Sequence, residues 1–322
     1  MNRSLSTSAV ALVSLAAVLW ALPAGCDKPA PPGGGKAAPR VALIMKSLAN
    51  EFFKTMEDGA RAHQKAHASE YKLIPNGIKD EQDVTRQIAI VEQMIAQEVD
   101  AIVIAPADSK ALVPVCRRAS DAGIVVVNID NKFDDAVLAD QKVRIPFVGP
   151  DNRKGARMAA ECLAKKLKPG DQVAIVEGVP NAFNGVQRKL GFQDAMRAAG
   201  MKVVSSQSAN WMPDQAENVV AGMLVQHPDL KAILCANDNM ALGAVAALTA
   251  AEKAGKVLVV GYDNISAVQK LMKEGKVLST IDQHADKIAV YGIEYALEVL
   301  REKTTPADKE TPVDLITADG LK

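Results

Sequence analysis

Aromatic residues are scarce in this chain of 322 residues, at 4% of the sequence, and neither sign of charge is in excess. There are 38 Lys and Arg residues and 38 Asp and Glu residues, so the formal net charge is zero. Without a long-range field to collect polyanions, the chain is not expected to bind nucleic acid. Hydrophobic residues make up 48% of the sequence, which is enough for a sizeable core and argues against a disordered chain.

Cysteine is also rare, and the four cysteines are far apart at positions 26, 116, 162 and 235. They form no CxxC pair and lack the Cys/His spacing of a structural zinc site. We therefore expect neither a disulfide framework nor a metal-dependent fold. Cys116, Cys162 and Cys235 lie in apolar patterns, which are typical of buried, unreactive thiols.

The local motifs of common catalytic sites are missing. The sequence contains no GxGxxG, GxxxxGK[ST], GxSxG or HExxH segment, and no nucleophile with a neighbouring base is visible. His63 and His67 stand four residues apart without a third metal ligand, which favours two solvated side chains. We expect a binding protein without a cofactor or metal, and an enzyme remains the alternative from a different class.

The N-terminal stretch has the order of a secretory signal. Arg3 precedes an apolar run over 9–22, which is shorter than the roughly 20 residues that span a bilayer, and small residues then lead to Cys26. Ala24-Gly25-Cys26 resembles a bacterial lipobox, whose cysteine is acylated. We predict a signal peptide over 1–26, lipidation at Cys26 and a Pro/Gly-rich tether over 27–39. The protein would then be periplasmic or extracytoplasmic and attached to the membrane only through this anchor. A cleaved signal followed by a free periplasmic protein is the alternative.

From Arg40 onward, short β-branched runs alternate with segments of helical period. The strand-like runs comprise residues 41–45, 101–106, 124–130, 172–178, 203–209, 232–238 and 257–263. The helix-like segments begin near Glu51, Ser109, Asn152, Asn184 and Asp214. This alternation predicts an α/β fold of βαβ units with parallel sheets. Because the remaining chain is too long for one ordinary core, we expect two doubly wound lobes.

Polar side chains stand at the carboxyl ends of the predicted strands, where open parallel sheets bind ligands. They are Lys46 with Asn50, Asp130 with Asn131, Asn237 with Asp238, Asp263 with Asn264, and Asp282 with Gln283. Together they offer the donors and acceptors that a ring of hydroxyl groups needs. Phe52, Phe53 and Trp211 also lie near strand ends and could cover the apolar faces of a sugar. Taken singly, each Asp or Asn could equally be a helix cap or a turn residue, and Phe52 or Phe53 could belong to the core.

Several stretches resemble the periplasmic sugar-binding proteins of ABC transporters, of the ribose- and allose-binding type within the type I periplasmic binding proteins. These stretches are LIMKSLANEFFKTMEDGA (43–60), VNIDNK (127–132), VAIVEG (173–178), VQRKLGF (186–192), ANWMPD (209–214), CANDNMALGA (235–244), GKVLVVGYD (255–263) and STIDQ (279–283). The allose-binding branch is the more similar one, because it also has a lysine at the position of Lys46.

The resemblance implies a set of ligand-binding residues in a cleft between the lobes. From the first lobe these are Lys46, Asn50, Phe52, Phe53, Asp130, Asn131 and, at the hinge, Gln283; from the second lobe they are Arg188, Trp211, Asn237 and Asp263. The chain departs from the family pattern at two positions. Glu51 stands where the family usually has proline, and Asn131 stands where the ribose type has arginine.

The resemblance also implies how the lobes are divided and what they do. A three-strand hinge would join a first lobe of residues 40–149 and 283–311 to a second lobe of 150–282 and 312–322. We expect a monomeric binding protein that closes on a monosaccharide, D-allose or a related hexose or pentose, and presents it to an ABC permease in the inner membrane. A binding protein that presents sugar or polyol to a chemotactic or kinase-linked receptor is the alternative. The effector half of a repressor is disfavoured, because no helix-turn-helix precedes Val41.

Overall fold

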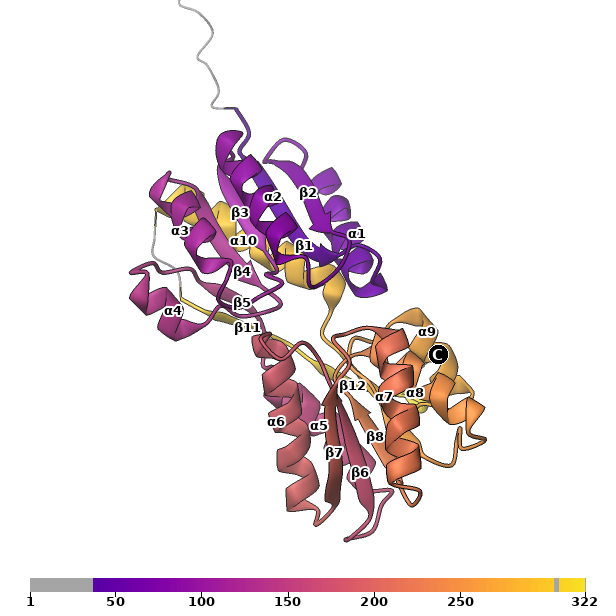
Figure 1. The fold of residues 1–322 in the computed structure, drawn as a ribbon. Helices are drawn as coiled ribbons and strands as arrows, with labels where there is room; N and C mark the ends of the chain where they lie inside the picture. The colour runs from indigo at the N-terminus through magenta and orange to yellow at the C-terminus, as the bar shows by residue number, and fades with distance from the viewer. Residues whose placement is uncertain (1–36, 304–306, 322) are drawn as a thin grey trace, which may run out of the picture. The chain divides into compact units, whose positions relative to one another are not determined.

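The computed structural model describes residues 37–303 and 307–321. The predicted signal peptide, Cys26 and nearly all of the predicted tether lie outside the described residues. Within the described part, residues from Ala38 onward form one unit that is built around two six-stranded sheets (Figure 1).

The first sheet is parallel throughout. Its strands lie in the order β11 (Lys309–Thr311), β5 (Phe147–Pro150), β4 (Val125–Ile129), β3 (Ala101–Ile104), β1 (Arg40–Ser47) and β2 (Lys72–Ile78). On β1, Val41, Leu43 and Met45 belong to one core cluster, whereas Ala42 and Ile44 belong to another. Since neighbouring residues of a strand face opposite sides, this sheet is covered by a core on each face.

The second sheet repeats the same plan. Its strands lie in the order β12 (Asp314–Thr317), β10 (Ser279–Asp282), β9 (Leu258–Val260), β8 (Ala232–Cys235), β6 (Gln172–Glu177) and β7 (Lys202–Ser208). Only the pairing of β12 with β10 is antiparallel among the strand pairs of the described residues. The predicted α/β class with two doubly wound sheets is therefore confirmed.

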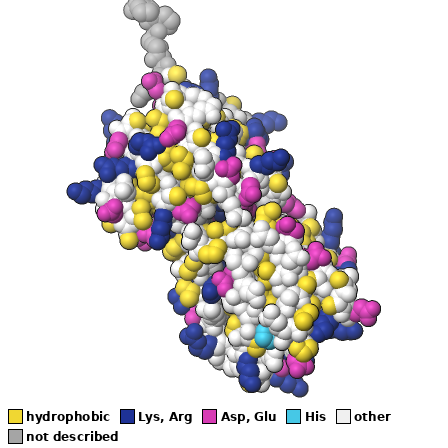
Figure 2. Space-filling view, in the orientation of Figure 1, with side chains coloured by type: hydrophobic (Ala, Val, Ile, Leu, Met, Phe, Trp, Pro, Cys, Tyr) yellow, Lys and Arg dark blue, Asp and Glu magenta, His cyan; other side chains and the backbone are white. Residues whose placement is uncertain are grey.

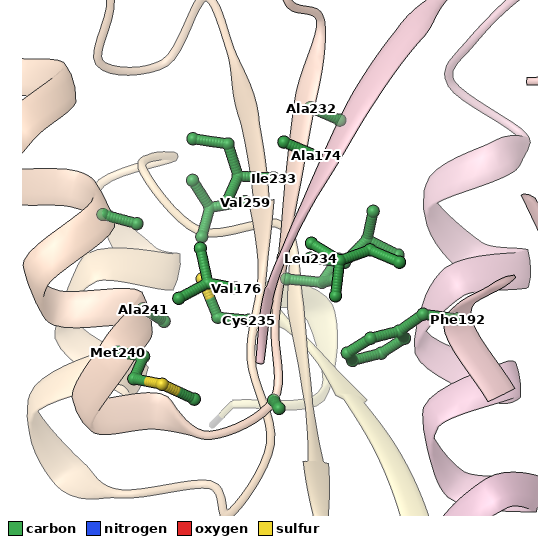
Figure 3. Packing of buried hydrophobic residues seen from close by; sticks show 14 of the residues in the cluster. Ala174, Val176, Phe192, Ala232, Ile233, Leu234, Cys235, Met240, Ala241 and Val259 are labelled. Carbon is green, nitrogen blue, oxygen red and sulfur yellow. The ribbon is translucent and has the colours of Figure 1, made fainter. Parts of the chain in front are cut away.

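Helices cover both faces of each sheet. Those of the first sheet are α1 (Glu51–Ala66), α2 (Val84–Ala96), α3 (Val113–Asp121), α4 (Asp135–Asp140) and α10 (Ala285–Glu302). Those of the second are α5 (Asn152–Ala164), α6 (Phe183–Ala198), α7 (Pro213–Gln226), α8 (Asp238–Ala250) and α9 (Ser266–Lys273). Figure 3 shows Ile233 and Leu234 on opposite faces of β8, with Phe192 of α6 on the Leu234 side and Met240 of α8 on the Ile233 side.

The chain passes between the two sheets at three places. It leaves β5 at Pro150 and enters α5 at Asn152, and it leaves β10 at Asp282 and enters α10 at Ala285. The third passage joins β11 to β12. As a consequence, α10 follows a strand of the second sheet but packs against α1, β3 and β4 of the first (Figure 1).

Five of the ten α-helices in the described residues begin at a polar residue that caps them. Asn50, Asp83, Asp134, Asp151 and Asn237 each accept a hydrogen bond from a backbone N–H in the first turn of the following helix. The helix expected from Ser109 begins later, at Val113. Asp108 accepts hydrogen bonds from the amides of Lys110 and Ala111, at 2.7 and 2.8 Å, and so holds this segment in a turn.

The surface carries both signs of charge side by side. On the face shown in Figure 2, Lys and Arg side chains are interspersed with Asp and Glu side chains. No helix in the described ranges combines the length and apolar character needed to cross a bilayer.

Candidate functional site

A small cavity lies where the carboxyl ends of the two sheets meet. The space among its lining side chains, including the part that is open to solvent, is about 230 Å³. It is lined by Lys46, Asn50, Phe52, Phe53, Glu81, Asp130, Asn184, Arg188, Trp211, Asn237, Asp263 and Gln283. All predicted ligand-contacting residues except Asn131 are among them, so residues from both ends of the sequence share one cavity.

Lys46 carries a buried positive charge on the first sheet's side of the cavity. It is 3% exposed at the end of β1, and its Nζ lies 3.1 Å from Oδ2 of Asp130 and 3.7 Å from Oε2 of Glu81. Burial lowers the pKa of Lys46, but the carboxylates of Asp130 and Glu81 outweigh burial and raise the pKa above its ordinary value. Lys46 therefore stays a charged donor in the cavity.

Asn50 and Glu81 are linked beside this lysine. Nδ2 of Asn50 donates a hydrogen bond to Oε1 of Glu81 at 3.0 Å, while Oδ1 of Asn50 accepts one from the Phe52 amide at 3.0 Å. The cap of α1 is therefore also part of the cavity wall. Burial raises the pKa of Glu81, and the charge of Lys46 opposes this rise only in part.

Arg188 is the corresponding positive charge on the second sheet's side. Its Nε donates to Oδ1 of Asn152 at 2.8 Å, and its Nη1 donates to the Ala236 carbonyl at 2.9 Å. The guanidinium lies over the ring of Tyr262, with Cζ 3.7 Å from the ring centroid. These contacts hold the planar group in one orientation.

Asp263 and Gln283 connect this arginine to the hinge. Nη1 of Arg188 lies 3.5 Å from Oδ1 of Asp263, and the same oxygen accepts a hydrogen bond from Nε2 of Gln283 at 2.7 Å. Burial raises the pKa of Asp263 well above its ordinary value, although the charge of Arg188 opposes it.

Aromatic rings border the cavity from both sheets. Phe52 and Phe53 pack edge to face with ring centroids 5.0 Å apart, and Trp211 approaches from the second sheet. Nζ of Lys46 lies 5.4 Å from the Phe53 centroid and 5.8 Å from that of Trp211. A Cβ on Gly178 would lie 2.1 Å from Cη2 of Trp211, so this glycine leaves the space that the indole occupies.

Three lining residues have a positive φ angle, at +59° for Asp130, +67° for Trp211 and +123° for Asp263. Residues other than glycine disfavour this backbone conformation, which costs roughly 1–3 kcal/mol for each residue. Such outliers cluster at ligand sites, because the surrounding fold holds the backbone in the turn that aims the side chain.

Asn131 does not line the cavity. Its Nδ2 donates to the Pro106 carbonyl at 2.9 Å, and its Oδ1 accepts from Ser109 Oγ at 3.3 Å and from the Asn184 amide at 3.2 Å. Since these bonds occupy both ends of the amide group, the expectation that Asn131 contacts the ligand does not match its position.

Glu81 and Asn184 line the cavity but are absent from the predicted set. Glu81 follows β2, a strand that sequence periodicity did not indicate, because Pro75 and Gly77 interrupt its pattern. Its polar position after that strand would have been the signal. Asn184 stands in the first turn of α6, and its position alone gives no signal of a site.

Within residues 37–303 and 307–321, no group of three His, Cys, Asp or Glu side chains has the arrangement of a metal site. His63 bonds through Nδ1 to the hydroxyl of Tyr71 at 2.9 Å, and His67 bonds through Nδ1 to Oε1 of Glu70 at 2.8 Å. Cys116 and Cys235 are buried and unpaired, and burial raises the pKa of the Cys116 thiol to about 12.

Comparison with known families agrees with this geometry. The family model described as "Periplasmic binding protein domain" matches residues 41–304. The chain belongs to this periplasmic binding protein family. The predicted resemblance is confirmed, and the protein is a solute-binding protein and not an enzyme.

Individual members of the periplasmic binding protein family show the same relationship. The D-ribose/D-allose-binding protein of Pseudomonas aeruginosa is 61% identical over 284 residues, which cover 87% of this chain and 89% of that protein.

Two solved ABC transporter solute-binding proteins match over nearly their whole length. One from Burkholderia multivorans, with an unknown ligand, has a TM-score of 0.86 at 61% identity and covers 88% of this chain and 100% of that chain. One from Actinobacillus succinogenes, with bound D-allose, has a TM-score of 0.83 at 37% identity and covers 88% of this chain and 99% of that chain.

Proposed function

We propose that the protein binds a monosaccharide in the cavity between its two lobes and delivers it to an ABC importer. The observation that carries this proposal is a pair of buried acceptors in the cavity wall. Oε1 of Gln283 has no hydrogen-bond partner among the described residues, and Oδ2 of Asp130 has only the ion pair with Lys46 at 3.1 Å. A sugar hydroxyl can donate to each of them, which for Gln283 removes a cost of roughly 1–3 kcal/mol for an unpaired buried group.

The donors of the cavity complement these acceptors. Lys46 and Arg188 offer charged N–H groups, and Asn50, Asn184 and Asn237 offer amides. Phe52, Phe53 and Trp211 provide apolar surfaces against which the C–H faces of a sugar ring pack.

The ligand that we propose is D-allose or a related hexose or pentose. This choice is supported by the relatives named for D-ribose and D-allose and by the similar solute-binding protein with bound D-allose. The site residues that we assign to the sugar are the ten predicted residues in the cavity wall together with Glu81 and Asn184.

We also propose that the protein is a lipoprotein, anchored through an acyl chain on Cys26, and that it acts as a monomer. The support for the anchor is the lipobox-like Ala24-Gly25-Cys26 and the Pro/Gly-rich segment that follows. The support for a monomer is that the large hydrophobic side chains exposed within the described ranges are few and lie on different segments of the chain; they are Leu48, Val186, Val203 and Val225.

A thermal-shift screen of the protein against about thirty sugars and polyols tests the ligand class, because a ligand that binds only the folded state stabilises it by about 2.7 kcal/mol at one hundred times its dissociation constant. We expect aldohexoses and aldopentoses to raise the melting temperature, with calorimetry confirming one site per chain. No response to any sugar or polyol would rule out the proposal.

A further inference from the structure

Three helices of the second lobe, α6, α7 and α9, begin without a capping side chain of their own, and α7 has Pro213, which lacks an N–H group, in its first turn. The N-cap residues of α6 and α9 are Ala182 and Ile265, and neither makes a side-chain cap hydrogen bond. In the same lobe, α5 and α8 are capped by Asp151 and Asn237. Since the first N–H groups of a helix have no partner within the helix, those of α6 and α9 need acceptors from elsewhere.

For α6, these acceptors come from the first lobe. The Phe183 amide donates to Oγ of Ser109 at 3.0 Å, and the Asn184 amide donates to Oδ1 of Asn131 at 3.2 Å. Ser109 and Asn131 are buried and hydrogen-bonded to each other, and Asn131 is anchored to the carbonyl of Pro106. The first lobe therefore presents a preformed pair of acceptors to the start of α6.

For α9, the acceptor is a carboxylate of the first lobe. The Ser266 amide donates to Oε1 of Glu51 at 2.8 Å, and Ser266 Oγ donates to Oε2 at 3.0 Å. A carboxylate at a helix N-terminus also interacts favourably with the helix dipole. Glu51 stands where the ribose- and allose-binding proteins usually have proline.

Both contacts lie next to the cavity. Glu51 is flanked by Asn50 and Phe52, and α6 carries Asn184 and Arg188, all of which line the cavity. The two capped helices belong to one lobe and the three capping side chains to the other. Opening the hinge would separate every one of these pairs and return the N–H groups to water.

We propose that Glu51, Ser109 and Asn131 are positioning residues for ligand capture, which cap α6 and α9 across the cleft in the closed form only. This inference rests on the proposed sugar-binding function and extends it: these residues set affinity without touching the ligand. Because binding requires closure, any contact that favours the closed form raises the apparent affinity. The contacts form after the ligand enters, so they slow its release more than they speed its entry.

Calorimetry and stopped-flow release with D-allose and D-ribose test the proposal on the full chain. Loss of a helix cap corresponds to a change of roughly 2- to 30-fold in an equilibrium constant. We therefore expect Glu51→Ala and Ser109→Ala each to weaken binding within this range, mainly through faster release. Glu51→Gln keeps an acceptor oxygen and should recover part of the loss.

Matched controls separate positioning from stability. Glu57→Ala removes a glutamate of α1 that pairs with Arg61 on the same helix, and Ser205→Ala removes a hydroxyl that accepts a hydrogen bond from Gln207 within the second lobe. Neither control should change affinity. Urea unfolding of the ligand-free protein should be the same for Glu51→Ala and Glu57→Ala, because the cap across the cleft is absent from the open form.

The inference would be overturned if Glu51→Ala and Ser109→Ala both bound sugar as tightly as the wild type. If the wild type binds neither sugar, the proposed ligand is wrong, and the caps are then measured directly by amide hydrogen exchange in the closed form, with the protein saturated by whichever sugar or polyol the thermal-shift screen identifies. Faster exchange of the Ser266 amide in Glu51→Ala than in Glu57→Ala supports them. Equal exchange overturns them.

Discussion

Five ionisable side chains are buried in the wall of one small cavity: Lys46, Glu81, Asp130, Arg188 and Asp263. Burying charges is expensive even when they are paired, and apolar residues of similar size would often be as stable. The cluster is therefore poorly explained by stability. It is well explained by recognition, because charged groups form the shorter and stronger hydrogen bonds to a ligand's hydroxyls.

Truncating either lobe's central charge should weaken sugar binding. Asp130→Ala removes the ion-pair partner of Lys46, and Arg188→Ala leaves Asp263 without its positive neighbour. Each change removes a charged partner from a buried ionisable group and a hydrogen-bonding group from the cavity wall, so we expect at least about a tenfold loss of affinity in calorimetry. Asp135 and Arg157 have exposed side chains, so the variants Asp135→Ala and Arg157→Ala serve as controls and should bind sugar as the wild type does. Unchanged affinity in both cavity variants would show that other residues hold the ligand.

The stability of the second lobe should depend on pH through Asp238. This carboxyl is fully buried and accepts hydrogen bonds from Thr280 Oγ1 and from the Ile265 amide, at 2.8 and 2.9 Å. Burial nevertheless raises the pKa of Asp238 to about 7. Above about pH 4 the unfolded chain loses this proton while the native state keeps it, so stability falls as the pH rises toward 7.

Urea unfolding of the ligand-free protein measures this effect. Between about pH 5 and pH 7 the free energy of unfolding of the wild type should fall by on the order of 2 kcal/mol more than that of Asp238→Asn. The Asp238→Asn variant serves as the reference for the wild type at each pH, because the asparagine side chain cannot titrate. Parallel pH curves for the two proteins would refute the raised pKa.

Strands and helices position the site through the turns that follow them. Asp130 comes directly after β4, Trp211 precedes α7, and Asp263 follows β9 with one intervening pair of residues. Each has a positive φ angle, so the turn and not the side chain's own preference sets its direction. The strands and helices thus form a rigid frame, and the strained turns at their ends point these side chains into the cavity.

Gly178→Ala tests the packing of one such turn. The added methyl group would meet the indole of Trp211, which must shift to make room. We expect a loss of sugar affinity of about three- to tenfold, the range of one aromatic contact. Gly222→Ala is the control, because a Cβ there meets nothing within 4 Å in the middle of α7. It should raise the free energy of unfolding by about 0.5–1 kcal/mol and leave affinity unchanged. Normal affinity in Gly178→Ala would mean that Trp211 does not contact the ligand.

The two lobes are joined by three connections and share the ligand groups between them. At one connection His284 has a φ angle of +55°, and its Nε2 lies 2.8 Å from Oδ2 of Asp314, the first residue of β12, which follows another connection. A ligand that contacts both lobes stabilises only the closed arrangement, which is the form that a permease can distinguish from the empty protein.

Attachment to the membrane should depend on Cys26 alone. We expect Cys26→Ser to move the protein from the membrane fraction to the soluble periplasmic fraction and to abolish labelling with a fatty-acid analogue, since a single thiol is the acylation site that we propose. Cys162→Ser, which changes a partly buried thiol of α5, should leave both properties unchanged. Retention of Cys26→Ser in the membrane fraction would contradict a lipid anchor.

Hydrophobic periodicity along the chain was enough to predict the α/β class and most strands, because a strand or helix requires a characteristic spacing of apolar residues within one segment. It also located Lys46, Asp130 and Asp263, since a parallel sheet gathers its strand ends at one edge. The edge strand β2 was missed because Pro75 and Gly77 weaken its pattern, and Glu81 was missed with it. The limits of the two lobes remain a prediction.

Contacts between the lobes could not be read from any local pattern. Glu51 and Ser266 are 215 residues apart, and Asn131 looked like a ligand-binding residue until its amide proved to be bonded to Pro106, Ser109 and Asn184. The residue types were compatible with either role. The role of each residue depends on how the two sheets approach each other. That approach is a property of packing across the cleft and not of any single segment.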